Sequence, residues 1–140
     1  MSAAAPLRAV FFDIGGTLGI VSGAPHARRL KPFDTSAALL TTMAKTLGLL
    51  VGVISNIPTD MSTDEVRAML AAAGLLPLLD GNAIVTSRDA SADKPAPQIY
   101  QFAATQVGLP IGQCLYVGED PGEVAGAQAA GMAGILKPAA

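Results

Sequence analysis

Five short apolar runs divide the chain, and each of them is continuous rather than alternating between apolar and polar residues. Continuous runs of this length are typical of strands that are buried on both faces, as in parallel sheets. The first run ends in a single carboxylate, Asp13, and two glycines stand at positions 15 and 16, after Ile14. The predicted strands cover residues 8–13, 51–55, 83–86, 114–117 and 134–136.

Four segments between these runs carry apolar residues at helical spacing and have recognisable ends. The sequence of residues 62–65, Ser-Thr-Asp-Glu, is that of a capping box, and Gly74 is a suitable stop for the helix that it opens. Prolines stand in the first turn of the third segment, and Gly131 follows the last one. The predicted helices cover residues 35–47, 62–74, 95–107 and 121–130.

Strands that alternate with helices along 140 residues predict a single α/β domain over residues 1–140. The expected architecture is a three-layer, doubly wound, Rossmann-like parallel sheet of about five strands. The longest stretch without a periodic pattern, residues 18–33, is interpreted as a flap, because a long loop in a compact domain is often functional.

The composition restricts the classes of protein that the chain can belong to. With 51% apolar residues the chain can bury a core, and its net charge of −2 argues against a nucleic-acid partner. Its single cysteine cannot form an internal disulfide. No apolar run is long enough for a membrane-spanning helix, and the N-terminus lacks the pattern of a signal peptide. We therefore expect a soluble, cytoplasmic protein without a membrane or nucleic-acid partner.

Polar side chains gather at the ends of four predicted strands. Asp13 ends the first, Ser55-Asn56 the second, and Glu119-Asp120 the fourth, while Lys94 follows the third after a short loop. Open parallel sheets bind ligands outside the carboxyl ends of their strands. This set suits phosphoryl transfer: a carboxylate attacks phosphorus, while a lysine, a hydroxyl and Mg²⁺ offset the negative charge.

Four motifs along the chain resemble those of the haloacid dehalogenase (HAD) superfamily of hydrolases. The first, D-x-D-G-T-L, corresponds to D-I-G-G-T-L, and the second to V-I-S-N. The third, K-P-x-P-x-I-Y, and the fourth, V-G-D-x-x-x-D, have counterparts in K-P-A-P-Q-I-Y and V-G-E-D-P-G-E-V. The matching segments are residues 13–18, 53–56, 94–100 and 117–124, and G-A-Q-A-A-G-M continues the last over residues 126–132.

The resemblance implies a Mg²⁺-dependent phosphatase that forms an aspartyl-phosphate. The implied catalytic residues are Asp13, the nucleophile, and Lys94, which neutralises charge. The implied phosphate-binding residues are Ser55, Asn56, Gly16 and Lys94. The implied metal ligands are Asp13, the carbonyl of Gly15, and Glu119 or its neighbour Asp120, with Glu123 as an outer-shell acid.

The stretches between the motifs are too short for the cap domain that many members of this superfamily carry. The chain therefore resembles an uncapped (C0-type) member, with the flap over its site. An open site suits a large substrate, such as a macromolecule, or closure by another subunit. The expected partner is a phosphorylated small molecule or macromolecule, and the oligomeric state is left open. The basic flap residues Arg28, Arg29 and Lys31 are interpreted as a solvated face or as an attraction for an anionic substrate.

Two positions depart from the pattern of the superfamily. Gly15 replaces the second aspartate, which normally protonates the leaving group, so the first motif is degenerate and its acid–base chemistry is altered. His26 in the flap is a candidate substitute for that acid. Glu119 replaces the aspartate of the fourth motif, and this exchange shifts the metal site or passes its role to Asp120.

Three functions are compatible with these motifs. The first is the phosphatase. The second is a HAD-fold binding or regulatory module with impaired catalysis. The third is a C–halogen hydrolase that uses Asp13 without a metal, since that branch of the superfamily also lacks the second aspartate.

Overall fold

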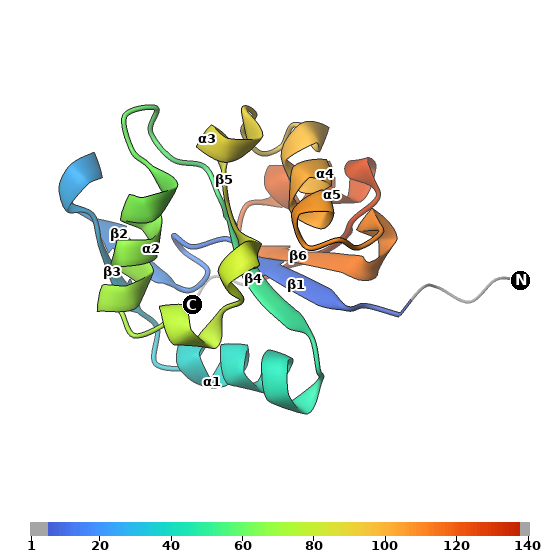
Figure 1. Ribbon diagram of the computed structural model, residues 1–140, viewed down its shortest axis with the longest axis horizontal. Coiled ribbons are helices and arrows are strands. Elements are labelled where there is room, and N and C mark those ends of the chain that lie inside the picture. The colour runs from blue at the N-terminus through green and yellow to red at the C-terminus, as the bar shows by residue number, and fades with distance from the viewer. Residues whose placement is uncertain (1–5, 138–140) are drawn as a thin grey trace, which may run out of the picture.

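A five-stranded parallel sheet forms the centre of the protein, as the computed structural model in Figure 1 shows; it describes residues 6–137. The strand order is β5-β4-β1-β6-β7, and every neighbouring pair is parallel. The predicted α/β sheet of about five strands is therefore confirmed. The strands are β1 (Ala9–Phe12), β4 (Leu50–Ser55), β5 (Ile84–Thr86), β6 (Cys114–Gly118) and β7 (Ala133–Leu136).

Helices cover both faces of the sheet, which makes three layers (Figure 1). Helices α1 (Ser36–Thr41) and α2 (Thr63–Ala72) pack on one face, and α4 (Pro97–Gln106) and α5 (Pro121–Ala130) pack on the other. A π-helical turn, Thr42–Thr46, extends α1 to nearly its predicted length. The capping box of α2 is formed, and none of the described helices has the length and apolar character needed to cross a membrane.

Alternation along β1 explains why the apolar runs are continuous. Val10 and Phe12 join the core beneath α1 and α2, whereas Ala9 and Phe11 join the core beneath α4 and α5. Successive side chains of a strand point to opposite faces, so a sheet covered on both faces needs apolar residues at every position.

The flap, residues 18–33, forms regular structure, and in this respect the prediction of an irregular loop is wrong. Strands β2 (Gly19–Ser22) and β3 (Arg29–Pro32) pair as an antiparallel hairpin, with a 3-10 turn at Pro25–Ala27 between them. Strands of four residues between glycine and proline give too few positions for a periodic signal. A Cβ on Gly19 would lie 2.2 Å from the carbonyl oxygen of Lys31, so only glycine fits this close strand pair.

Short elements fill the remaining connections, and none of them builds a second domain. Between β1 and β4 the chain forms only the hairpin and α1 with its π-helical turn. Between β4 and Lys94 it forms α2, β5, two 3-10 turns and α3 (Ser87–Ala90), which replaces part of a predicted loop. Residues 6–137 therefore contain no inserted cap domain, as expected of an uncapped member.

Candidate active site

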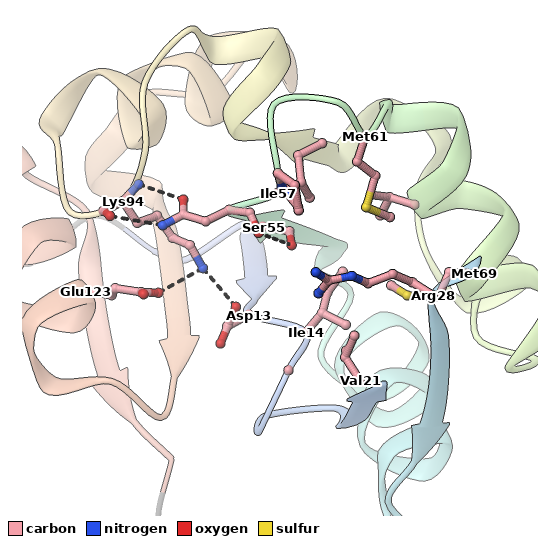
Figure 2. Close-up of a pocket in the computed structure, with 14 residues that line it drawn as sticks. Asp13, Ile14, Val21, Arg28, Ser55, Ile57, Met61, Met69, Lys94 and Glu123 are labelled. Carbon is pink, nitrogen blue, oxygen red and sulfur yellow. Dashed lines mark hydrogen bonds and ion pairs between the residues drawn. The ribbon is translucent and has the colours of Figure 1, made fainter. Parts of the chain in front are cut away.

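The carboxyl ends of β1 and β4 open into a cavity of about 220 Å³. Asp13 follows β1 and Ser55 ends β4, while Lys94 precedes α4 and Glu123 lies in the first turn of α5. All four residues line this cavity, although they lie up to 110 positions apart in sequence (Figure 2). The parallel sheet brings them together because its strands end at one edge.

The ammonium of Lys94 lies at the centre of a buried ion network. Its Nζ is 2.9 Å from Oδ1 of Asp13 and 2.9 Å from Oε1 of Glu123 (Figure 2), and it is 2.8 Å from the hydroxyl oxygen of Tyr116. The lysine side chain is 1% exposed. Two hydrogen bonds, to Asp13 and Tyr116, and the ion pair with Glu123 thus place three protein oxygens within 2.9 Å of the ammonium. The positive charge is therefore held beside the Asp13 carboxylate before any substrate binds.

Tyr116 is the member of this network that the sequence did not reveal. Its hydroxyl accepts from Lys94 and donates to Oε1 of Glu123 at 3.0 Å. Burial, with the nearby charges of Asp13 and Glu123, raises the pKa of Tyr116 far above its usual range, so its hydroxyl stays neutral. Its ring meets Tyr100 edge to face, with 5.6 Å between the ring centroids. A tyrosine inside the apolar run of residues 114–117 was the feature of the sequence that could have indicated a buried hydroxyl near the site.

Asn56 supports Lys94 through the main chain. Its Oδ1 accepts from the backbone N–H of Lys94 at 2.8 Å, and its Nδ2 donates to the Lys94 carbonyl at 3.1 Å. The side chain predicted to bind phosphate is thus engaged in fixing the start of the Lys94 segment. Ser55, by contrast, lines the cavity, and its hydroxyl makes only a long contact of 3.5 Å with the Asn56 carbonyl.

The turn after Asp13 brings Glu119 and the two glycines together. Gly16 has a φ of +80°, and a Cβ there would lie 2.5 Å from the carboxyl carbon of Glu119. The N–H of Gly16 donates to the Gly19 carbonyl at 2.8 Å, so it is engaged within the turn. Ile14 and Gly15 line the cavity, and their backbone N–H groups have no hydrogen-bond acceptor within residues 6–137.

Asp120 occupies the N-cap of α5. Its Oδ1 accepts from the N–H groups of Gly122 at 2.8 Å and of Glu123 at 3.3 Å. Such caps satisfy donors at the helix start that have no partner within the helix. Within residues 6–137 no group of three Asp, Glu, His or Cys side chains is arranged to bind a metal ion.

The half of the cavity beneath the hairpin differs from the half around Lys94. Its wall is apolar except for the guanidinium of Arg28, which the hairpin contributes (Figure 2). The wall is formed by Ile14, Val21, Ile57, Met61, Val66 and Met69.

His26 does not line the cavity. Its Nδ1 is 2.8 Å from Oε2 of Glu65, and its Nε2 is 3.6 Å from Oδ2 of Asp60. The histidine thus links the hairpin to the start of α2, outside the site where a leaving group would need a proton.

Comparisons with known proteins agree with this fold and identify its family. The family model for haloacid dehalogenase-like hydrolases matches residues 24–131. Phosphatase MT3486 of Mycobacterium tuberculosis is 34% identical over 93 residues, which are 66% of this chain and 41% of that protein. The chain thus spans about two fifths of the length of this curated relative.

Two solved structures show the same arrangement of elements. A dehalogenase crystallised with an intermediate complex is 26% identical, with a TM-score of 0.67, over 77% of this chain and 45% of that one. An uncharacterised protein from Listeria monocytogenes serotype 4b is 22% identical, with a TM-score of 0.77, over 93% of this chain and 78% of that one. The second likeness shows the fold alone. Because the family model matches more than half of the chain, the protein belongs to the haloacid dehalogenase-like hydrolases.

Proposed function

We propose that this hydrolase is a phosphatase whose nucleophile is Asp13. The observation that carries the proposal is the 2.9 Å ion pair between Lys94 and Oδ1 of Asp13, at the wall of a cavity of about 220 Å³. A buried lysine lowers the repulsion between a carboxylate and an incoming phosphate. The curated relative, which is named a phosphatase, supports the same reaction.

The reaction proceeds through two displacements at phosphorus. In the first, a carboxylate oxygen of Asp13 bonds to phosphorus, and the bond to the leaving-group oxygen breaks with its electron pair on that oxygen. In the second, water attacks phosphorus, the Asp13 carboxylate is released, and the water proton passes to phosphate or solvent. The hydroxyl of Ser55 and the N–H groups of Ile14 and Gly15 donate to the phosphoryl oxygens.

The donor set at the Asp13 turn fits Mg²⁺, which prefers oxygen ligands and usually keeps several waters beside one or two carboxylates. Lys94 contacts Oδ1 of Asp13 and leaves Oδ2 without a hydrogen-bond partner in the described part of the chain. The carboxylate of Glu119 lies against the backbone of Gly16, one residue after Gly15. Asp13, Gly15 and Glu119 would hold the ion, which would supply positive charge beside the phosphoryl group.

The leaving group departs without a proton from the protein. Of the described residues around the cavity, the carboxylates are those of Asp13 and Glu123, and both are paired with Lys94. Position 15 has no side chain, and the candidate substitute, His26, lies elsewhere. The site is therefore suited to leaving groups that are stable as anions, such as the carboxylate of an acyl phosphate or a nitrophenolate.

A second candidate is the hydrolysis of a carbon–halogen bond, and the apolar half of the cavity favours it. Six apolar side chains there would accept the carbon chain of a halogenated substrate. One of the similar structures is named a dehalogenase. In that reaction Asp13 attacks carbon, halide leaves with the bonding pair, and no metal takes part.

Release of nitrophenolate from p-nitrophenyl phosphate, with and without Mg²⁺, tests the proposal and separates the two candidates. We expect turnover that requires Mg²⁺, and Asp13→Asn falls to the background rate because an amide oxygen is a far weaker nucleophile than a carboxylate. Asp64→Asn, an exposed site on α2, is the matched control and keeps wild-type turnover. Halide release from 2-chloropropionate that is indifferent to chelator, with no phosphatase activity, would establish the second candidate instead.

A further inference from the structure

Arg28 has no acidic partner although it stands next to an active-site cavity. Its Nε is buried and finds no hydrogen-bond partner among the described residues. None of the four ion pairs in residues 6–137 includes it. Figure 2 shows its guanidinium inside the cavity, directed toward the side where Ser55 and Asp13 lie.

Glu65, the carboxylate that could have paired with Arg28, is already bonded to other groups. Glu65 borders a second groove that Arg28 also lines. Its Oε2 bonds to His26 at 2.8 Å, and its Oε1 accepts from the N–H and the hydroxyl of Ser62. The positive charge of the guanidinium is therefore not paired with Glu65, and it can attract an anion in the cavity on its other side.

An arginine in this setting is suited to one kind of ligand. Its planar guanidinium binds the two oxygens of a carboxylate or a phosphate side by side, and such charge-assisted bonds are strongest out of water. Leaving a partly buried polar group without a partner costs free energy, which a bound anion recovers. The neighbouring Val21, Met61 and Met69 are apolar and would contact a carbon skeleton.

The groups proposed to bind the phosphoryl group lie at the other end of the cavity, so Arg28 is not required for that role. Asp13, the Ser55 hydroxyl and the free N–H groups of the Asp13 turn all lie there, beside the fixed charge of Lys94. A substrate that spans the cavity thus places its phosphoryl group at one end and a different group at the guanidinium.

We propose that Arg28 forms a second anion subsite, so that the substrate is a small phosphorylated compound with a carboxylate or a second phosphate beyond a short apolar segment. This inference rests on the proposed phosphatase function and narrows its substrate class. Arg28 is the residue that selects such doubly anionic substrates over simple phosphate esters.

Binding of three non-hydrolysable phosphonates, measured by calorimetry with Mg²⁺ present, tests the subsite. The probes are benzylphosphonate, 4-carboxybenzylphosphonate and p-xylylene bisphosphonate, which share one apolar ring and differ in the second group. We expect the wild type to bind at least one doubly anionic probe about 10-fold or more tighter than benzylphosphonate. The stronger of the two shows whether carboxylate or phosphate is preferred.

Two variants isolate the contribution of the guanidinium. In Arg28→Met the affinity ratio between the doubly anionic probe and benzylphosphonate falls to about one, because the apolar stem remains and the charge is lost. Arg29→Met, a neighbouring and exposed arginine outside the cavity, keeps the wild-type ratio. Circular dichroism of each variant checks that it is folded.

Three results would overturn the inference. In the first, the wild type binds all three probes with equal affinity. In the second, the wild type binds none of them. In the third, Arg28→Met lowers the affinity for every probe but leaves the affinity ratio unchanged. The last assigns Arg28 to the phosphoryl group. Turnover of p-nitrophenyl phosphate is measured in parallel, so loss of the subsite with intact turnover leaves the phosphatase function standing. Selective binding without any turnover refutes that function instead.

Discussion

At one end of the cavity three protein oxygens lie within 2.9 Å of the Lys94 ammonium, whereas at the other end Nε of Arg28 has no acceptor in the described residues. The first end is buried in the sheet and helix layers, and the second is built on a two-stranded hairpin. Groups that perform chemistry gain from being fixed in advance, because no reorganisation is then needed during the reaction. Groups that recognise a ligand must keep their donors free for it.

The hairpin is also attached to the rest of the protein in a different way. The Lys94 network is enclosed, with a lysine side chain that is 1% exposed. The contact between His26 and Glu65 that links the hairpin to α2 is at the surface, with a histidine side chain that is 63% exposed. Water and salt screen the second contact far more than the first, so the two ends should respond differently to mutation and to pH.

Lys94→Met should have the largest effect, because it removes the cation that Asp13 and Glu123 share. Two carboxylates are then left near each other without a counter-charge, and breaking such a buried pair costs about 3 kcal/mol of unfolding free energy. We expect this loss in urea unfolding at pH 7, together with loss of phosphatase turnover. An unchanged urea midpoint would contradict the contribution of the Lys94 network to the stability of the fold.

Gly15→Asp should have the second largest effect, because it adds a general acid to the end of the cavity where Asp13 lies. A Cβ at residue 15 would meet only Cγ2 of Val21, at an ordinary contact of 3.6 Å, so the backbone leaves room for a Cβ there. For phenyl phosphate, whose leaving group needs a proton, kcat/KM should rise about 10²-fold. Steady-state kinetics against Gly15→Asn, which has the same shape and no acidic proton, provide the comparison, and an equal rise in both variants excludes acid catalysis.

His26→Gln should have the smallest effect, and one that depends on pH. The hydrogen bond and charge of Glu65 raise the pKa of His26 above its ordinary value of 6.5, and His26 in turn lowers the pKa of Glu65. The stabilisation by His26 is therefore complete below pH 6.5 and is lost as the pH rises through the raised pKa. Thermal unfolding should show a Tm difference between wild type and variant at pH 6 that disappears at pH 9. A difference that is the same at both pH values argues against this ion pair.

The sequence motifs predicted residues that the structure brings to one end of the cavity, because these residues follow strand ends. Asp13, Ser55 and Lys94 each stand where a predicted strand or its loop ends, and parallel strands bring such positions together. The same reasoning could not separate Ser55, which lines the cavity, from Asn56, whose side chain holds the backbone of Lys94. The direction of a side chain depends on the local backbone, which a motif does not specify.

The sequence by itself determined the α/β sheet, because its apolar runs are continuous and its helix boundaries carry caps and glycines. It also determined the absence of an acid at residue 15. The tertiary structure alone decided that residues 18–33 fold as a hairpin, that Tyr116 joins the Lys94 network, and that Arg28 lines a cavity and has no carboxylate partner among residues 6–137. The strands of the hairpin are too short to give a periodic signal, and the contacts of Tyr116 and Arg28 join segments far apart in the chain, which neither local periodicity nor local composition records.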